Sequence, residues 1–186
     1  MMNQKAKEEY AIVLDFLPNG HPFDSKSGLK TPIAQAIGRE FFILLELVPK
    51  KGNFLQPHEE VYIGDGKRDK IHHIYGKIDY ERLTQTAKEE LNYIVEELVK
   101  KHEIKFIEFF NKAGPINTRR HQLELLPGIG KKHMSEIIER RDEELFKDFN
   151  DIKTRVKLMP DPEKTVAKRI LIELKGEDRY NLFTGQ

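Results

Sequence analysis

The spacing of apolar residues changes once along the chain, near Asp79, and this change constrains the fold more than any other feature. Before it, apolar residues recur at period two, which is typical of strands, as at Phe41, Ile43, Leu45 and Leu47. After it, spacings of 4, 4, 3, 1 and 3 predict an amphipathic helix that contains Leu83, Ala87, Leu91, Ile94, Val95 and Leu98. The sequence therefore predicts an α+β protein with a β-rich domain at residues 1–80, connecting helices at 81–115 and a helical domain at 116–180.

Four segments of the first domain are expected to form strands. They cover residues 9–17, 33–48, 60–64 and 71–78, which are rich in β-branched and aromatic residues. Gly38, inside the second segment, predicts a bulge or a sharp bend, and residues 65–69 predict a hairpin loop. Short strands with glycine bends favour a small β-barrel similar to an OB fold.

Composition excludes several classes of protein. The 186 residues contain no Cys, which rules out disulfide scaffolds, zinc ribbons, thiol catalysis and iron–sulfur clusters. The longest apolar run, residues 41–45, is far shorter than the ~20 residues of a membrane span. Residues 1–10 lack the apolar core of a secretory signal. We therefore expect a cytoplasmic protein that does not contact a membrane.

Motifs for catalysis or cofactor binding are absent from the sequence. It holds no P-loop and no nucleophile elbow, and its seven His show neither an HxH nor an HExxH spacing. We therefore expect no enzymatic activity, no cofactor and no zinc site.

The segment Leu-Leu-Pro-Gly-Ile-Gly-Lys-Lys is the most informative part of the chain. Pro127 presets the backbone for a turn, and Gly128 and Gly130 permit positive φ and expose backbone amides. A helix that begins near Lys131 would direct its free amides and the positive end of its dipole at the turn, which is a phosphate-binding arrangement. Lys132 adds a second positive side chain there.

This pattern resembles the helix-hairpin-helix motif of proteins that bind nucleic acids without sequence specificity. The matching positions are Leu123, Leu126, Gly128, Ile129 and Gly130. Met134 departs from the pattern, because the family has a small residue there, usually Ala. The resemblance implies that the turn contacts phosphate and that the carbonyls of Glu124, Leu126 and Ile129 can hold a monovalent cation.

A second copy of the pattern, offset by 33 residues, indicates a tandem domain. Residues 158–164 align with residues 125–131, and Ala167 occupies the small-residue position, although both glycines are missing. One helical hairpin buries too little apolar surface to fold alone. We therefore expect an all-α tandem helix-hairpin-helix domain in which residues 146–156 form the first helix of the second copy.

Other basic residues of the helical domain are candidates for contacting nucleic acid. Arg119 and Arg120 are expected on the helix that leads into the turn. Lys164 and Lys168 are expected on a basic face of the second copy, together with Arg169. The alternative for each set is an ordinary solvated helix face.

The β-rich domain offers a second candidate surface. Lys67 and Arg68 lie close in sequence to Tyr62 and Tyr75, and OB-like barrels stack bases on aromatic side chains beside a basic groove. The alternative is that the aromatic rings belong to the core and the charges cover a hairpin.

The order of the parts resembles a family of uncharacterised archaeal proteins that pair an OB-like domain with this helical domain. The resemblance implies nucleic-acid binding. The net charge of +1, from 32 basic and 31 acidic residues, does not decide the matter, because binding needs only a local basic patch. We expect binding of RNA or DNA through backbone contacts. The alternative is a protein-interaction module that docks on a ribosomal or transcription complex.

Overall fold

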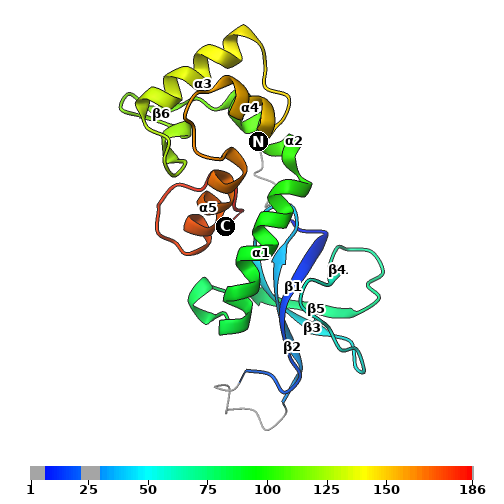
Figure 1. The fold of residues 1–186 in the computed structure, drawn as a ribbon. Coiled ribbons are helices and arrows are strands. Elements are labelled where there is room, and N and C mark those ends of the chain that lie inside the picture. The colour runs from blue at the N-terminus through cyan, green and yellow to red at the C-terminus, as the bar shows by residue number, and fades with distance from the viewer. Residues whose placement is uncertain (1–6, 22–29, 186) are drawn as a thin grey trace, which may run out of the picture. The chain divides into compact units, whose positions relative to one another are not determined.

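The computed structural model describes residues 7–21 and 30–185. They form two compact units (Figure 1). The first comprises the described residues up to Ile94 together with those from Glu173 onward, and the second comprises Val95–Ile172. The first boundary falls inside a helix, α1 (Gln85–Lys101), and the second falls near the end of another, α5 (Pro162–Leu174). Each unit is described by itself below.

The first unit is built on a curled, five-stranded antiparallel sheet that forms a half-barrel (Figure 1). Its strands are β1 (Tyr10–Leu17), β2 (Ile33–Gly38), β3 (Leu44–Pro49), β4 (Glu60–Tyr62) and β5 (Ile71–Lys77). Their order in the sheet is β4-β1-β2-β3-β5. The mixed α+β class is thus confirmed.

The single extended segment predicted at residues 33–48 is wrong, because two paired strands and a tight turn occupy it. The Gly38 amide donates to the Ile43 carbonyl at 2.8 Å, and Phe42 takes a φ of 54° in the turn. Gly38 therefore ends β2. A Cβ at Gly38 would lie 2.0 Å from Oε1 of Glu8, whose carboxylate accepts the backbone amides of Glu40 and Phe41. Glycine is needed here for that close approach.

The predicted hairpin at residues 65–69 is also wrong. Strand β4 pairs antiparallel with β1, and β5 pairs antiparallel with β3. Because β1 and β3 both run antiparallel to β2, β4 and β5 run in the same direction and lie at opposite edges of the sheet. A hairpin joins antiparallel neighbours. The OB-like barrel stays a prediction, since β4 and β5 are not paired with each other in the described part of the chain.

Both faces of the central strands are buried. Val13, Ala36 and Leu45 belong to the apolar cluster on one face. On β1, Ile12 and Leu14 flank Val13 and point to the opposite face, and they are also buried. The other face is associated with α1, which runs beside the sheet (Figure 1).

The start of α1 is tied to two strands by hydrogen bonds. The Thr84 amide donates to Gln35 Oε1 at 2.9 Å, and the Thr84 hydroxyl donates to Asp15 Oδ2 at 2.6 Å. The amide of Ala87 in turn donates to the Thr84 hydroxyl, which caps the helix. The helix predicted from the period change is confirmed.

The segment after Leu174 returns to the first unit, where the carboxylate of Glu173 holds it. This buried carboxylate accepts hydrogen bonds from the backbone amides of Leu182, Phe183 and Thr184 and from the Thr184 hydroxyl. Phe183 and Thr184 are themselves buried. This segment is therefore packed as far as residue 185, whose amide donates to the Phe41 carbonyl at 2.8 Å.

The second unit contains the end of α1 and four further helices. They are α2 (Glu103–Lys112), α3 (Lys131–Glu143), α4 (Phe149–Arg155) and α5. The prediction of an α-helix that leads into the turn is wrong. A two-stranded ribbon of β6 (Pro115–Asn117) and β7 (Arg120–His121) takes its place, and a short 3₁₀ helix, η2 (Gln122–Leu125), follows the ribbon.

Polar contacts fix this ribbon locally. The side-chain oxygen of Gln122 accepts a hydrogen bond from the Gly114 backbone amide, and the backbone amide of Gln122 donates to the Gly114 carbonyl. His121 and Glu124 form a capping box at the start of η2.

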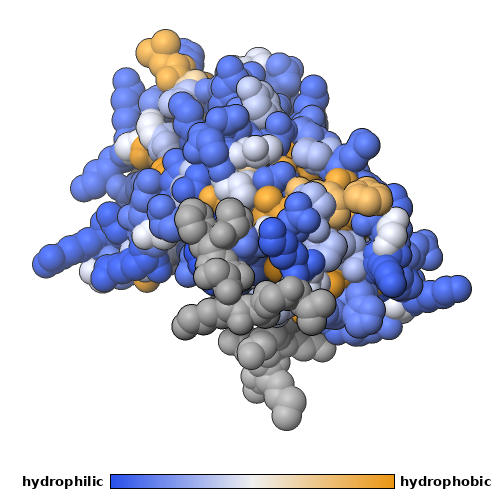
Figure 2. All heavy atoms as spheres, turned by 90° about the horizontal axis from the view of Figure 1, so that it is seen from below, coloured by the Kyte–Doolittle hydropathy of each residue, from blue (hydrophilic) through white to orange (hydrophobic). Residues whose placement is uncertain are grey.

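The surface is largely polar, as the charged fraction of 34% suggests. On the face that Figure 2 shows, hydrophilic residues predominate and hydrophobic ones occur in small groups. None of the helices in residues 7–21 and 30–185 is both long and apolar enough to cross a membrane.

Candidate nucleic-acid interface

The glycine-rich segment forms a tight turn between η2 and α3. The Ile129 amide donates to the Leu126 carbonyl at 3.1 Å, and the Met134 amide donates to the Gly130 carbonyl at 2.9 Å. Gly128 has a φ of +80°, a conformation that glycine adopts without steric cost. Helix α3 begins at Lys131, as the sequence predicts.

The turn is anchored by its apolar residues. Ile129 is 5% exposed and Leu126 is 1% exposed, so both side chains point into the second unit. Pro127 is half-buried, whereas Gly128 and Gly130 are exposed. The burial of Ile129 between two exposed glycines holds the backbone amides at the surface.

Several amides at the start of α3 have no acceptor among the described residues. Gly130 is the N-cap residue and has no side chain to cap the helix. In the part of the chain that the structure describes, no hydrogen bond is made by the amides of Gly130, Lys131 and Lys132. The side chains of Lys131 and Lys132 are exposed. Free amides and the positive end of the helix dipole therefore lie at one exposed point, on the first turn that also carries these two lysines.

The second turn of the proposed repeat lies against the first. A Cβ added to Gly128 would lie 3.0 Å from Cγ of Pro160, so the two turns are in contact. Their chemistry differs, because the Asp161 carboxylate accepts the Lys164 amide at 3.1 Å and pairs with the Lys153 ammonium at 2.5 Å. The start of α5 is thus capped by a carboxylate of the chain, whereas the start of α3 is not.

Basic residues expected on α5 are divided between surface and core. Lys164 and Lys168 are exposed, as predicted for a basic face. Arg169 is only 2% exposed, and its Nη1 donates to the Leu125 carbonyl at 3.1 Å. The prediction that Arg169 belongs to the basic face is wrong. Its guanidinium instead ties α5 to the residue just before the turn. The helical spacing from buried Val166 was a sequence signal for this position.

The monovalent cation implied by the resemblance stays a prediction. The Leu126 carbonyl already accepts the Ile129 amide, and the neighbouring Leu125 carbonyl accepts Arg169. The Glu124 carboxylate, which is separate from the backbone carbonyl of this residue, accepts the His121 amide at 2.9 Å. Among the described residues, no cluster of His, Cys, Asp or Glu is placed to hold a metal ion.

Arg119 and Arg120 lie at the tip of the β6–β7 ribbon, not on a helix. The Arg119 amide donates to Asn117 Oδ1 at 2.9 Å, which fixes the tip. Both arginines are exposed, and they line a shallow groove of 610 Å³ together with Lys131. The ribbon thus brings two predicted cations to the same depression as the start of α3.

His121 also lines this groove, where it acts as a neutral capping residue. Its Nδ1 accepts the Leu123 amide at 3.1 Å, which requires an unprotonated nitrogen. Burial and the positive charge of Arg141 lower the pKa of His121, while Glu124 opposes this shift. Arg141 itself donates to the Phe110 carbonyl and is part of the packing.

The candidates in the β-rich unit are placed less favourably. The Tyr62 hydroxyl accepts the Gly66 amide at 3.0 Å, and Arg68 Nε donates to the Gly64 carbonyl at 2.8 Å. Both side chains therefore hold the loop that follows β4.

The other two candidates of this unit are exposed but separate. Lys67 lines a shallow depression with Tyr62, but Glu60 and Asp69 line it too. Tyr75 on β5 is 66% exposed and does not line this depression. In the second unit, the predicted residues Arg119, Arg120 and Lys131 line one groove beside the turn. In the first unit, the predicted residues do not all line one depression.

The fold and the turn define an α+β protein that joins a half-barrel sheet to a helical unit with an uncapped helix N-terminus. Residues 7–185 match the family model described as DUF655, protein of unknown function, and the chain belongs to this family. The Uncharacterized protein MJ0038 of Methanocaldococcus jannaschii is 47% identical over 178 residues, which cover 95% of this chain and 79% of that protein.

A solved structure shares the fold. The crystal structure of Af1531 from Archaeoglobus fulgidus is 46% identical in sequence, with a TM-score of 0.85 over 95% of this chain and 99% of that one. The resemblance to an uncharacterised archaeal family is thus confirmed.

Proposed function

We propose that this protein binds nucleic acid through the phosphate backbone, and that the turn before α3 is the contact. The observation that carries the proposal is the uncapped start of α3 at Gly130, where the amides of Lys131 and Lys132 have no acceptor among the described residues. A phosphate oxygen placed there would satisfy these donors and interact favourably with the helix dipole.

The surrounding charge supports an anionic ligand. Lys131 shares its groove with Arg119 and Arg120, while the carboxylate of Glu124 on the same groove is occupied by the His121 amide. Phosphate contacts position a protein without reading sequence, so we expect weak sequence preference. Binding through few contacts has a Kd of about 10⁻⁴ to 10⁻⁶ M at physiological salt. RNA and DNA are both candidates, and this role requires no enzymatic activity.

A second candidate function is docking on a ribosomal or transcription protein. It is favoured by exposed apolar side chains on the second unit, where Ile104 is 79% exposed and Leu145 is 62% exposed. Exposed apolar residues can mark a protein-binding surface. Such an interaction would persist at high salt, unlike a contact based on phosphate.

The test is fluorescence anisotropy with labelled single-stranded and double-stranded RNA and DNA at several salt concentrations. The observed affinity should fall linearly with salt on logarithmic axes. Replacing Lys131 and Lys132 by Ala should weaken binding to all sequences alike and reduce the salt slope by about 2, because each lysine neutralises one phosphate.

A matched variant controls for net charge. Lys112 and Lys147 also lie in the second unit and are paired with Glu108 and Glu144. Their replacement by Ala should leave affinity and slope unchanged. An equal loss in both variants would show that only overall charge matters, and the turn would then not be the binding site. Absence of binding to every strand at low salt would favour the protein-docking function.

A further inference from the structure

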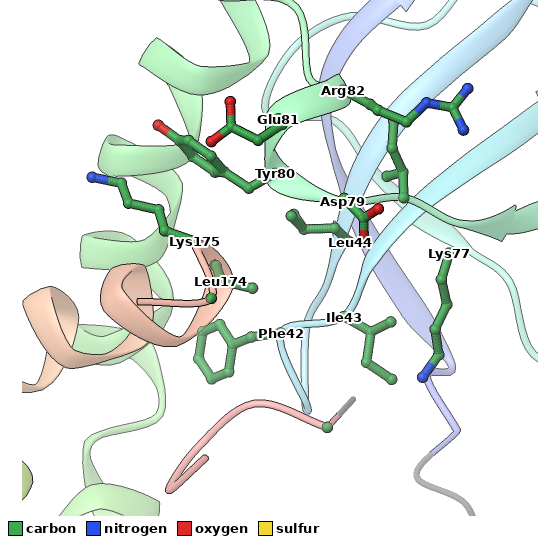
Figure 3. Close-up of a pocket in the computed structure, with 13 residues that line it drawn as sticks. Phe42, Ile43, Leu44, Lys77, Asp79, Tyr80, Glu81, Arg82, Leu174 and Lys175 are labelled. Carbon is green, nitrogen blue, oxygen red and sulfur yellow. The ribbon is translucent and has the colours of Figure 1, made fainter. Parts of the chain in front are cut away.

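The first unit contains a partly enclosed pocket of 480 Å³ (Figure 3). Three stretches of chain form it: the β2–β3 turn and the start of β3, the end of β5 with the η1 helix (Tyr80–Arg82), and the last residue of α5 with the segment that follows it. Its volume falls within the range of small-molecule sites, about 300 to 1,000 Å³.

The pocket has an apolar floor. Phe42, Ile43 and Leu174 line it, and all three are buried. In Figure 3 these side chains lie between Lys175 on one side and Lys77 on the other. The wall that contains Leu174 and Lys175 is held in place by the adjacent Glu173, whose carboxylate binds the returning chain segment. The floor therefore offers a site for a hydrocarbon chain or ring.

The rim carries more free positive charge than negative charge. Among the described residues, Lys77, Arg82 and Lys175 form no ion pair, although Lys175 lies 5.6 Å from the Tyr80 ring centroid. Of the two acidic residues, Glu81 pairs with Lys88 at 3.7 Å. The Asp79 carboxylate makes no hydrogen bond or ion pair with the residues that the structure describes.

We propose that this pocket binds a small organic anion. The apolar body of the ligand lies on Phe42, Ile43 and Leu174, and its carboxylate or phosphate pairs with Lys77 or Lys175. Asp79 accepts a hydrogen bond from a hydroxyl or amine of the ligand. Aryl carboxylates and nucleoside monophosphates both have this chemistry. The proposal is independent of the turn before α3.

The experiment titrates the full-length protein with the fluorescent dye 1-anilinonaphthalene-8-sulfonate, which combines an aromatic body with one negative charge. We expect saturable binding of one dye per chain. The double variant Lys77→Glu and Lys175→Glu should weaken dye binding about tenfold, since each reversal replaces an attraction by a repulsion. The variant Lys30→Glu and Lys51→Glu makes the same charge change on exposed lysines outside the pocket and should have less than a twofold effect.

Competition identifies the source of the anion. Displacement of the dye by indole-3-acetate indicates a carboxylate ligand, and displacement by adenosine monophosphate indicates a nucleotide. The proposal is wrong if the dye does not bind saturably, if both double variants lose affinity equally, or if inorganic phosphate alone displaces the dye as well as these compounds do. Replacing Gly130 by Asp should leave dye binding unchanged, which separates this site from the proposed phosphate contact.

Discussion

Replacing Gly130 by Asp should strongly weaken nucleic-acid binding without destabilising the protein. Gly130 has a φ of −96° and a ψ of −173°, an extended conformation that any residue adopts, and a Cβ there meets no atom within 4 Å. As N-cap residue, an Asp carboxylate would accept the amide of Lys132 or His133. The free energy of unfolding should therefore stay the same or rise by a few tenths of a kcal/mol.

The same carboxylate would compete with phosphate for the amides and repel it. Two like charges about 4 Å apart repel by about 1 kcal/mol in bulk water and about 4 kcal/mol at a partly screened surface. These energies correspond to a loss of roughly fivefold to several hundredfold in affinity.

The assay is the same anisotropy titration, with thermal melts to establish folding. Replacing Gly130 by Asn is the matched control, because its amide side chain caps the helix without adding charge. Its affinity should lie between those of the wild type and the Asp variant. If the folded Asp variant binds as tightly as the wild type, the start of α3 does not contact phosphate and the reasoning fails.

Two further predictions concern stability. Leu158 has a φ of 56°, which strains a residue with a Cβ, and its side chain is 93% exposed. Replacing it by Gly should therefore relieve strain without removing a buried side chain, and should raise Tm by roughly 1 to 4 °C. A lower Tm in calorimetry would contradict this prediction. Because the pKa of His121 is lowered in the folded state, the unfolded chain binds more protons at this residue. The contribution of His121 to the free energy of unfolding is therefore complete above about pH 6.5, and it is lost as pH falls through the pKa of the folded state. Thermal melts from pH 8 to 5 should show this loss, and His121→Asn, which retains a capping side chain, should reduce it.

Sequence reasoning succeeded where local spacing determines structure. The periodic apolar residues of α1 and the turn residues before α3 act over one or two helical turns, so both elements are visible in the sequence. The β2–β3 turn was missed because its cause is distant: Glu8 packs against Gly38 and binds the amide of Phe41. No pattern within residues 33–48 reports that contact.

The ribbon that carries Arg119 was missed for a related reason. Leu123 and Leu126 fit the apolar spacing of a helix, and both are buried, but only a short 3₁₀ helix forms there. The clamp between Gln122 and Gly114 and the capping box at His121 favour the ribbon instead. Side chains that hydrogen-bond to nearby backbone compete with a regular helix. The outcome changes the site, because it places Arg119 on the groove shared with Lys131.

The two turns of the second unit offer a comparison within one molecule. They are in contact at Gly128 and Pro160, and each precedes a helix of 13 residues. The carboxylate of Asp161 already satisfies an amide at the start of α5, whereas Gly130 leaves the start of α3 open. A helix N-terminus that binds no external anion gains stability from such an acidic cap. The absence of one at Gly130, beside a turn that has one, is what a phosphate-binding role for the first turn would require.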